Sequence, residues 1–177
     1  MKNISFFLFA VCSSFHFIFA QNNWDWKTSN IEFKIKNAGF YVTGTLKGLE
    51  AKINFFDGGK DDQIEASVKT NTINTNNNAR DRHLKKDDYF DVEKYPNITM
   101  KSISFSKINN ENYKGVFKLT IKNVTKTIEI PFSFKKNGKS GMFDTSFVIN
   151  RLDYGIGESS WVLGNNVTIK MSIQVVQ

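Results

Sequence analysis

The sequence predicts an all-β domain, an antiparallel β-barrel of about eight strands with one short helix in a crossing segment. Apolar and polar residues alternate with period two along most of the chain, and short turn sequences separate these stretches. No run of helices supplies a second apolar layer. A sheet with one apolar face buries that face and removes its edges by closing into a barrel. A two-sheet sandwich is the alternative.

The first twenty residues have the features of a secretory signal peptide. Lys2 provides a short basic start, an apolar stretch follows, and the segment ends on the small residue Ala20. The only cysteine, Cys12, lies inside it and follows Val11, a poor match to a lipoprotein attachment site. We expect cleavage near Ala20, a periplasmic or secreted product, and one domain over residues 21–177 without a disulfide.

The first half of the domain alternates clearly. Strands are predicted over 31–36, 40–46, 49–55 and 64–68, with a hairpin loop at 57–62. The alternation stops at 80–96, where charge is dense, and this segment is predicted to form a short helix and a turn that cross the barrel. Tyr89, Phe90 and Val92 are its expected apolar anchor, and Pro96 leads into the next strand.

The second half continues the pattern. Strands are predicted over 98–105, 113–122, 128–134, 143–149 and 167–175, with a long irregular loop over 150–164. The alternation slips in the first of them, which predicts a bulge near Ser102. Pro131 cannot donate to a ladder, so it is expected at an edge or bulge.

The net positive charge of the chain says little about its function. Removing a leader that contains Lys2 lowers the formal net charge from +7 to +6. Most lysines occupy the polar side of alternating strands, a pattern typical of a solvated face and not of a nucleic-acid site. Transient contact with an anionic membrane surface stays open, as does a homodimer.

The sequence contains few residues that could bind a metal ion or catalyse a reaction. His83 is the one histidine after the leader, so no metal site is expected. No G-x-S-x-G motif occurs, and the only visible catalytic pair is His83 with Asp81 or Asp87. We therefore expect no enzyme. The cluster around Arg80 either binds a polar head group or caps the crossing segment.

Several long blocks resemble the YceI-like family of polyisoprenoid-binding proteins. They are RDRHL at 80–84, DYFDVEKYPNIT at 88–99, LTIKNVTK at 119–126, INRLDYGI at 149–156 and LGNNVTI at 163–169. The resemblance implies a lipocalin-like, extended barrel whose cavity holds a long isoprenoid of the quinone or prenyl-phosphate type. The family often has histidines near its first strand, where this chain has Ser29-Asn30 and Lys36-Asn37.

With that resemblance, the inward-facing apolar residues become candidates for the cavity wall. They are Phe33, Ile35, Phe40, Phe117, Leu119, Phe132, Phe134, Phe147, Ile149 and Met171. The candidates for the polar end are Arg80, Arg82, His83 and Arg151. No cofactor is expected apart from a bound isoprenoid lipid. Many aromatic side chains on one inner face also fit a filled barrel, which would make the protein a secreted stress or protein-interaction module without a lipid ligand.

Overall fold

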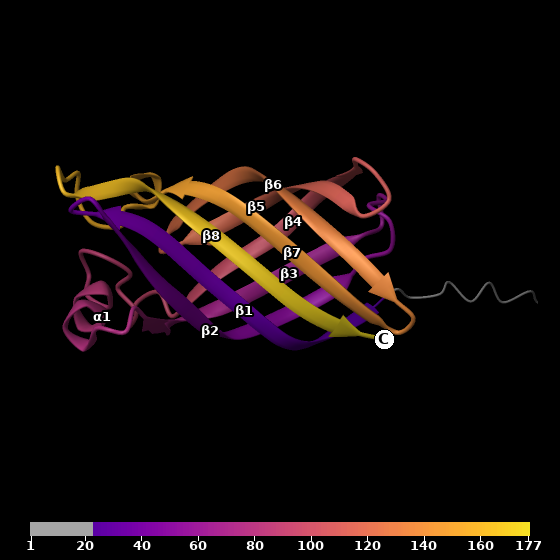
Figure 1. Cartoon of the computed structure of the whole chain (residues 1–177), viewed down its shortest axis with the longest axis horizontal. Helices are drawn as coiled ribbons and strands as arrows, with labels where there is room; N and C mark the ends of the chain where they lie inside the picture. The colour runs from indigo at the N-terminus through magenta and orange to yellow at the C-terminus, as the bar shows by residue number, and fades with distance from the viewer. Residues whose placement is uncertain (1–22) are drawn as a thin grey trace, which may run out of the picture.

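The computed structural model describes residues 23–177, so the expected leader lies outside the described residues. Eight antiparallel strands form a closed barrel in which each strand pairs with the next and the last pairs with the first (Figure 1). The fold class is confirmed, and the sandwich is excluded. The strands are β1 (Asn23–Asn37), β2 (Phe40–Asn54), β3 (Gln63–Asn74), β4 (Asn97–Lys107), β5 (Asn112–Ile121), β6 (Val124–Asn137), β7 (Ser140–Asn150) and β8 (Leu163–Val176).

The predicted short helix is α1 (Asn78–Leu84), which lies between β3 and β4 and begins two residues before the predicted crossing segment at 80–96. The helix begins there because the side chain of Asn77 accepts a hydrogen bond from the backbone N–H of Arg80, at 3.0 Å. A second short element, the 3-10 helix η1 (Arg151–Tyr154), follows β7 inside the predicted long loop. Both elements lie at the same end of the barrel, which we call the mouth end (Figure 1).

Two local irregularities follow from the sequence. A register shift between Ser102 and Ser104 confirms the predicted bulge. The β7-facing side of Pro131 is a local edge, as predicted, although every strand of the barrel has two neighbours. Pro131 lies one residue before Phe132, where the β6–β7 ladder begins, and toward the mouth end these two strands have no paired residues. The 3-10 helix contacts β6.

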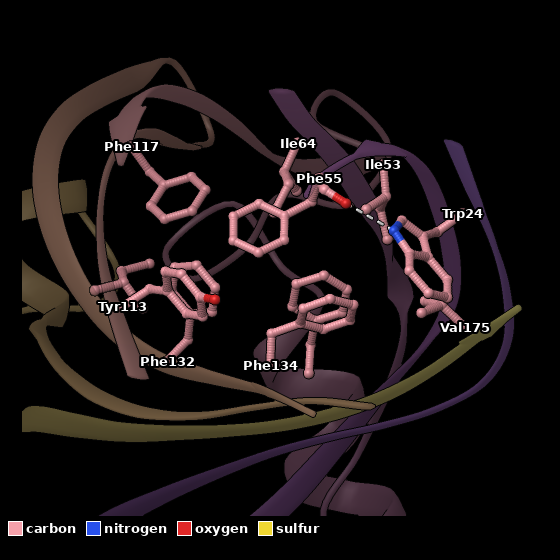
Figure 2. Packing of buried hydrophobic residues seen from close by; sticks show 11 residues of the cluster. Trp24, Ile53, Phe55, Ile64, Tyr113, Phe117, Phe132, Phe134 and Val175 are labelled. Atoms are coloured by element: carbon pink, nitrogen blue, oxygen red, sulfur yellow. Dashed lines mark hydrogen bonds between the residues drawn. The ribbon is translucent and has the colours of Figure 1, made fainter. Parts of the chain in front are cut away.

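The other end of the barrel is filled by aromatic side chains, and we call it the packed end. Phe55 is fully buried at its centre and makes edge-to-face contacts with five other rings, at centroid distances of 5.1–5.5 Å. Trp24 closes this end, and its indole N–H donates to the Phe55 carbonyl at 2.8 Å (Figure 2). The packed end therefore supplies the main hydrophobic core.

Both ends of the described chain lie at the packed end. Asp25 pairs with Val176 across β1 and β8, and Asn23 pairs with Asn54 on β2 (Figure 1). The mouth end is built from the β1–β2 turn, the crossing segment, the β5–β6 turn and the loop between β7 and β8.

Candidate functional site

The mouth half of the barrel contains an apolar cavity in two chambers. The outer chamber has a volume of about 260 Å³ and extends from the mouth, and the inner chamber of about 100 Å³ lies behind it. The chambers are neighbours because five side chains line both. These are Leu46, Ile98, Ile121, Ile149 and Ile169.

The inner chamber ends at the aromatic core. Its wall includes Leu119, Phe147 and Met171, and Phe147 also packs against the core cluster. The barrel is therefore divided: the packed end provides stability, and the mouth half leaves room for an apolar ligand. Pockets for small molecules are typically apolar and concave in this way.

Six of the ten expected wall residues line the two chambers. Phe33 and Ile35 line the outer chamber, Leu119, Phe147 and Met171 line the inner one, and Ile149 lines both.

Four expected wall residues lie elsewhere. Phe117, Phe132 and Phe134 are buried in the aromatic cluster of the packed end, where neighbouring rings cover them, and not at either chamber. Phe40 follows the β1–β2 turn, and its side chain is 79% exposed to solvent because the strand has only begun there. These four assignments are corrected.

Phe33 reaches into the outer chamber because it pairs with a glycine. Its partner on β2 is Gly44, and a Cβ atom at Gly44 would collide with the Phe33 ring. The register across this pair is continuous, so Gly44 provides close approach of a ring and not a bulge.

Two arginines, Arg80 and Arg151, line the outer chamber and form what we call the cationic rim. His83 and the buried Thr75 also line this chamber. The Arg80 guanidinium donates from Nε to Thr75 Oγ1 at 2.7 Å and from Nη2 to the Thr75 carbonyl at 2.9 Å. Thr75 in turn donates its hydroxyl proton to Asp81 at 2.6 Å.

Arg82 does not belong to this rim. It is exposed and does not line the chamber, since residues two apart on a helix face different sides. Of the four expected polar residues, Arg80, His83 and Arg151 line the outer chamber and Arg82 does not.

His83 pairs with an acid other than the two considered from the sequence. Its Nε2 atom lies 3.0 Å from Asp88 Oδ2, in an exposed pair, and its ring packs edge-to-face on Tyr89. The Asp81 carboxylate instead accepts from the N–H and the hydroxyl of Thr75. Residues 23–177 contain no group of three His, Cys, Asp or Glu side chains arranged to hold a metal ion.

Arg151 organises the loop that covers the mouth. It is 2% exposed and donates to the carbonyls of Ile156 at 2.7 Å, Glu158 at 2.8 Å and Gly164 at 2.9 Å. Burial lowers the pKa of its guanidinium, which still stays charged because an arginine starts from a very high pKa. Within residues 23–177 neither Arg80 nor Arg151 forms an ion pair, and the nearest link to an acid runs from Arg80 through the Thr75 hydroxyl to Asp81.

The two segments that cover the mouth are tied together. Gly157 donates its N–H to the Asp88 carbonyl at 2.7 Å, and the Lys122 ammonium donates to the carbonyls of Asp87 and Gly155. Tyr89 and Phe90 pack against the apolar cluster around Tyr154, and Val92 is buried, which confirms their expected role as an anchor.

Several wall residues were not predicted individually. They are aliphatic and lie on the inward phase of their strands, namely Val42, Leu46, Ile98, Ile121, Val167 and Ile169. The period-two pattern contains the signal for them. Several inward-facing phenylalanines lie in the packed end, whereas these aliphatic residues of the same strand phase line the outer chamber.

Among residues 23–177 no helix combines the length and the apolar character needed to cross a membrane. The fold and the cavity together define the class: a small closed antiparallel β-barrel with an apolar chamber open at one end. The chain belongs to the YceI-like family, since the model of the YceI-like domain matches residues 23–175.

Known relatives agree with this assignment. A UPF0312 protein of Pseudomonas fluorescens is 31% identical over 162 residues, which cover 83% of this chain and 81% of the relative. The crystal structure of Burkholderia cenocepacia BcnA has a TM-score of 0.77 at 22% identity, covering 82% of this chain and 95% of that one.

A third solved structure is described as a polyisoprenoid binding domain from Saccharophagus degradans implicated in plant cell wall breakdown. It has a TM-score of 0.70 at 14% identity and covers 87% of this chain and 97% of that one. At these identities the two solved structures show a shared fold.

Proposed function

We propose that this protein is an exported, non-catalytic carrier that holds the tail of a long isoprenoid lipid in the two-chamber cavity. The observation that carries the proposal is the cavity itself: a continuous apolar space in the mouth half, closed at its inner end by aromatic side chains. The description of the Saccharophagus degradans domain as polyisoprenoid binding supports the same ligand class.

The driving force is the transfer of the tail out of water. Each buried methylene contributes about 0.8 kcal/mol, so one five-carbon isoprene unit contributes about 4 kcal/mol before entropic costs. The walls fit this role because the inner chamber is lined mostly by aliphatic side chains, together with Phe147.

The cationic rim fits a polar or anionic head group. Arg80 and Arg151 lie at the outer chamber without an ion-pair partner among residues 23–177. A diphosphate or a quinone oxygen would find there the guanidinium N–H groups of Arg80 that Thr75 does not use, because those of Arg151 are directed to backbone carbonyls of its own loop. The tail would extend past Ile149 toward Phe147. The prenyl-phosphate type fits this charge better than the quinone type does.

A second function is favoured by one observation, the filled packed end. If side-chain rearrangement fills the mouth half in the same way, the protein would be an interaction module without a lipid ligand. The signal-like leader and periplasmic or extracellular location apply to both proposals.

Mass spectrometry of an organic extract of the purified native protein distinguishes them. We expect an isoprenoid lipid in stoichiometric amount. If the extract contains none, the protein is offered quinones and prenyl diphosphates of several lengths. A folded protein that takes up none of these contradicts the carrier proposal and favours the interaction module.

A further inference from the structure

Large apolar side chains are exposed together at the mouth end. Trp161 is fully exposed, Phe40 and Tyr41 are 79% and 66% exposed, and Val162 is 59% exposed. They come from two segments that the fold brings together, since the Ala38 N–H donates to the Val162 carbonyl at 2.7 Å. We call these four residues the tip.

The backbone of the tip is held in place. The Ser160 hydroxyl accepts from the N–H groups of Val162 and Leu163, at 3.2 and 3.3 Å. Ala38 and Gly39 form a two-residue turn with positive φ at both positions, the geometry of a tight hairpin. Trp161 is therefore presented to the surroundings by an ordered loop, and its exposure is a feature of the fold.

The tip borders the entrance of the outer chamber. Asn37 and Leu163, which pair across β1 and β8, both line that chamber, and they immediately adjoin Ala38 and Val162. A surface that contacts the tip would therefore lie next to the cavity opening.

Lysines accompany these aromatic rings. The Lys34 ammonium lies 3.9 Å from the centroid of the Tyr41 ring, and Lys36 lines the same surface hollow as Trp161 and Val162. The loop between β7 and β8 also carries two acids, Asp153 and Glu158, and the backbone carbonyl of Glu158 accepts a hydrogen bond from Arg151. Tryptophan and tyrosine beside lysine are the residues that suit the boundary between acyl chains and anionic head groups.

We propose that the tip docks the mouth end onto the surface of a lipid bilayer, with Trp161 at the level of the head groups. Docking would place the cavity opening against the membrane, so that an apolar tail passes between bilayer and barrel without crossing water. This passage rests on the proposed carrier function, whereas docking itself does not.

Co-sedimentation with vesicles tests the docking. The chain is prepared from Gln21 onward, so that the expected leader cannot bind lipid itself, and is mixed with vesicles of phosphatidylcholine with and without phosphatidylglycerol. We expect binding that increases with phosphatidylglycerol. Trp161→Glu removes one large apolar side chain from the contact, so it should lower the partition coefficient by about tenfold or more.

Phe56→Glu is the matched control. Phe56 is also a highly exposed aromatic residue, at 63%, but it follows β2 at the packed end. This variant receives the same charge and should bind vesicles like the original protein. Circular dichroism establishes that both variants are folded, which is expected because both positions lie on the surface.

The outcomes separate docking from the carrier function. Docking is overturned if the original protein does not bind vesicles, if Trp161→Glu binds them equally well, or if Phe56→Glu loses binding to the same extent. Docking onto a bilayer is also overturned if the protein does not bind vesicles but binds a protein partner through Trp161. Uptake of an isoprenoid delivered in detergent is measured separately. Vesicle binding that depends on Trp161 without any such uptake supports docking and contradicts only the carrier function.

Discussion

Replacing Ile149 with tryptophan tests whether a ligand tail occupies both chambers. Ile149 lines the outer and the inner chamber, so a larger side chain at this position would extend into the passage between them. A tail that enters the outer chamber would then be stopped before the inner one.

The expected loss follows from the size of the inner chamber. Its volume is about 100 Å³, which is several times the 10–15 Å³ that one water molecule needs by a comparable measure, so we assign it roughly one isoprene unit. Excluding five carbon atoms at about 0.8 kcal/mol each removes at most about 4 kcal/mol of binding free energy. The Kd of a long isoprenoid should therefore rise by one to three powers of ten, and that of a two-unit isoprenoid should rise less.

The measurement is a titration of each variant with isoprenoids of increasing length, followed by tryptophan fluorescence or calorimetry. Val148→Trp is the control, because Val148 is the adjacent residue on the outer face of β7 and is 57% exposed. Urea unfolding of both variants shows whether they are stably folded. Equal affinity of Ile149→Trp and the original protein for every length would refute the assignment of the tail to these chambers, as would an equal loss in Val148→Trp.

Three further changes test the structure around the site. Arg151→Met should lower the free energy of unfolding by about 3 kcal/mol in urea titrations, because the carbonyls that the guanidinium bonds lose a charged donor; an unchanged midpoint would contradict its organising role. Gly44→Val should lower it by about 1–3 kcal/mol, since the new side chain collides with Phe33, and the double variant with Phe33→Ala should recover part of the loss. Burial and then the hydrogen bond to Asp57 raise the pKa of Tyr113 to about 12. The stability that depends on its protonated phenol is therefore complete below about pH 10 and is lost between about pH 10 and 12. Tyr113→Phe should flatten this part of the profile of unfolding free energy against pH, and an unchanged slope would exclude Tyr113 as its source.

Most of the barrel could be predicted from the sequence because alternation with period two is a local signal. Most strands, the bulge near Ser102 and a short helix between the third and fourth strands follow from neighbouring residues. The stretches 40–46 and 49–55, predicted as two strands, form the single strand β2. Closure of the sheet into a barrel could be predicted because no helices are available to cover its apolar face or its edges.

The division of the barrel into a packed end and a cavity could not be predicted in this way. Phe117 and Ile149 both point inward by strand phase, yet one lies in the aromatic core and the other at the chambers. Which half a residue occupies depends on how the strands are staggered, a property of the closed sheet. Arg82 lies outside the chamber for a local reason, because residues 80 and 82 lie on different sides of any helix.

Because the two ends of the described chain emerge beside each other at the packed end, a tether at either one would leave the mouth end facing outward. A probe surface, a bead or a fused fluorescent protein attached at Asn23 or Gln177 would lie at the opposite end of the barrel from the cavity entrance. This arrangement (Figure 1) makes the protein suitable for oriented immobilisation, in which every attached copy offers the same opening to the solution.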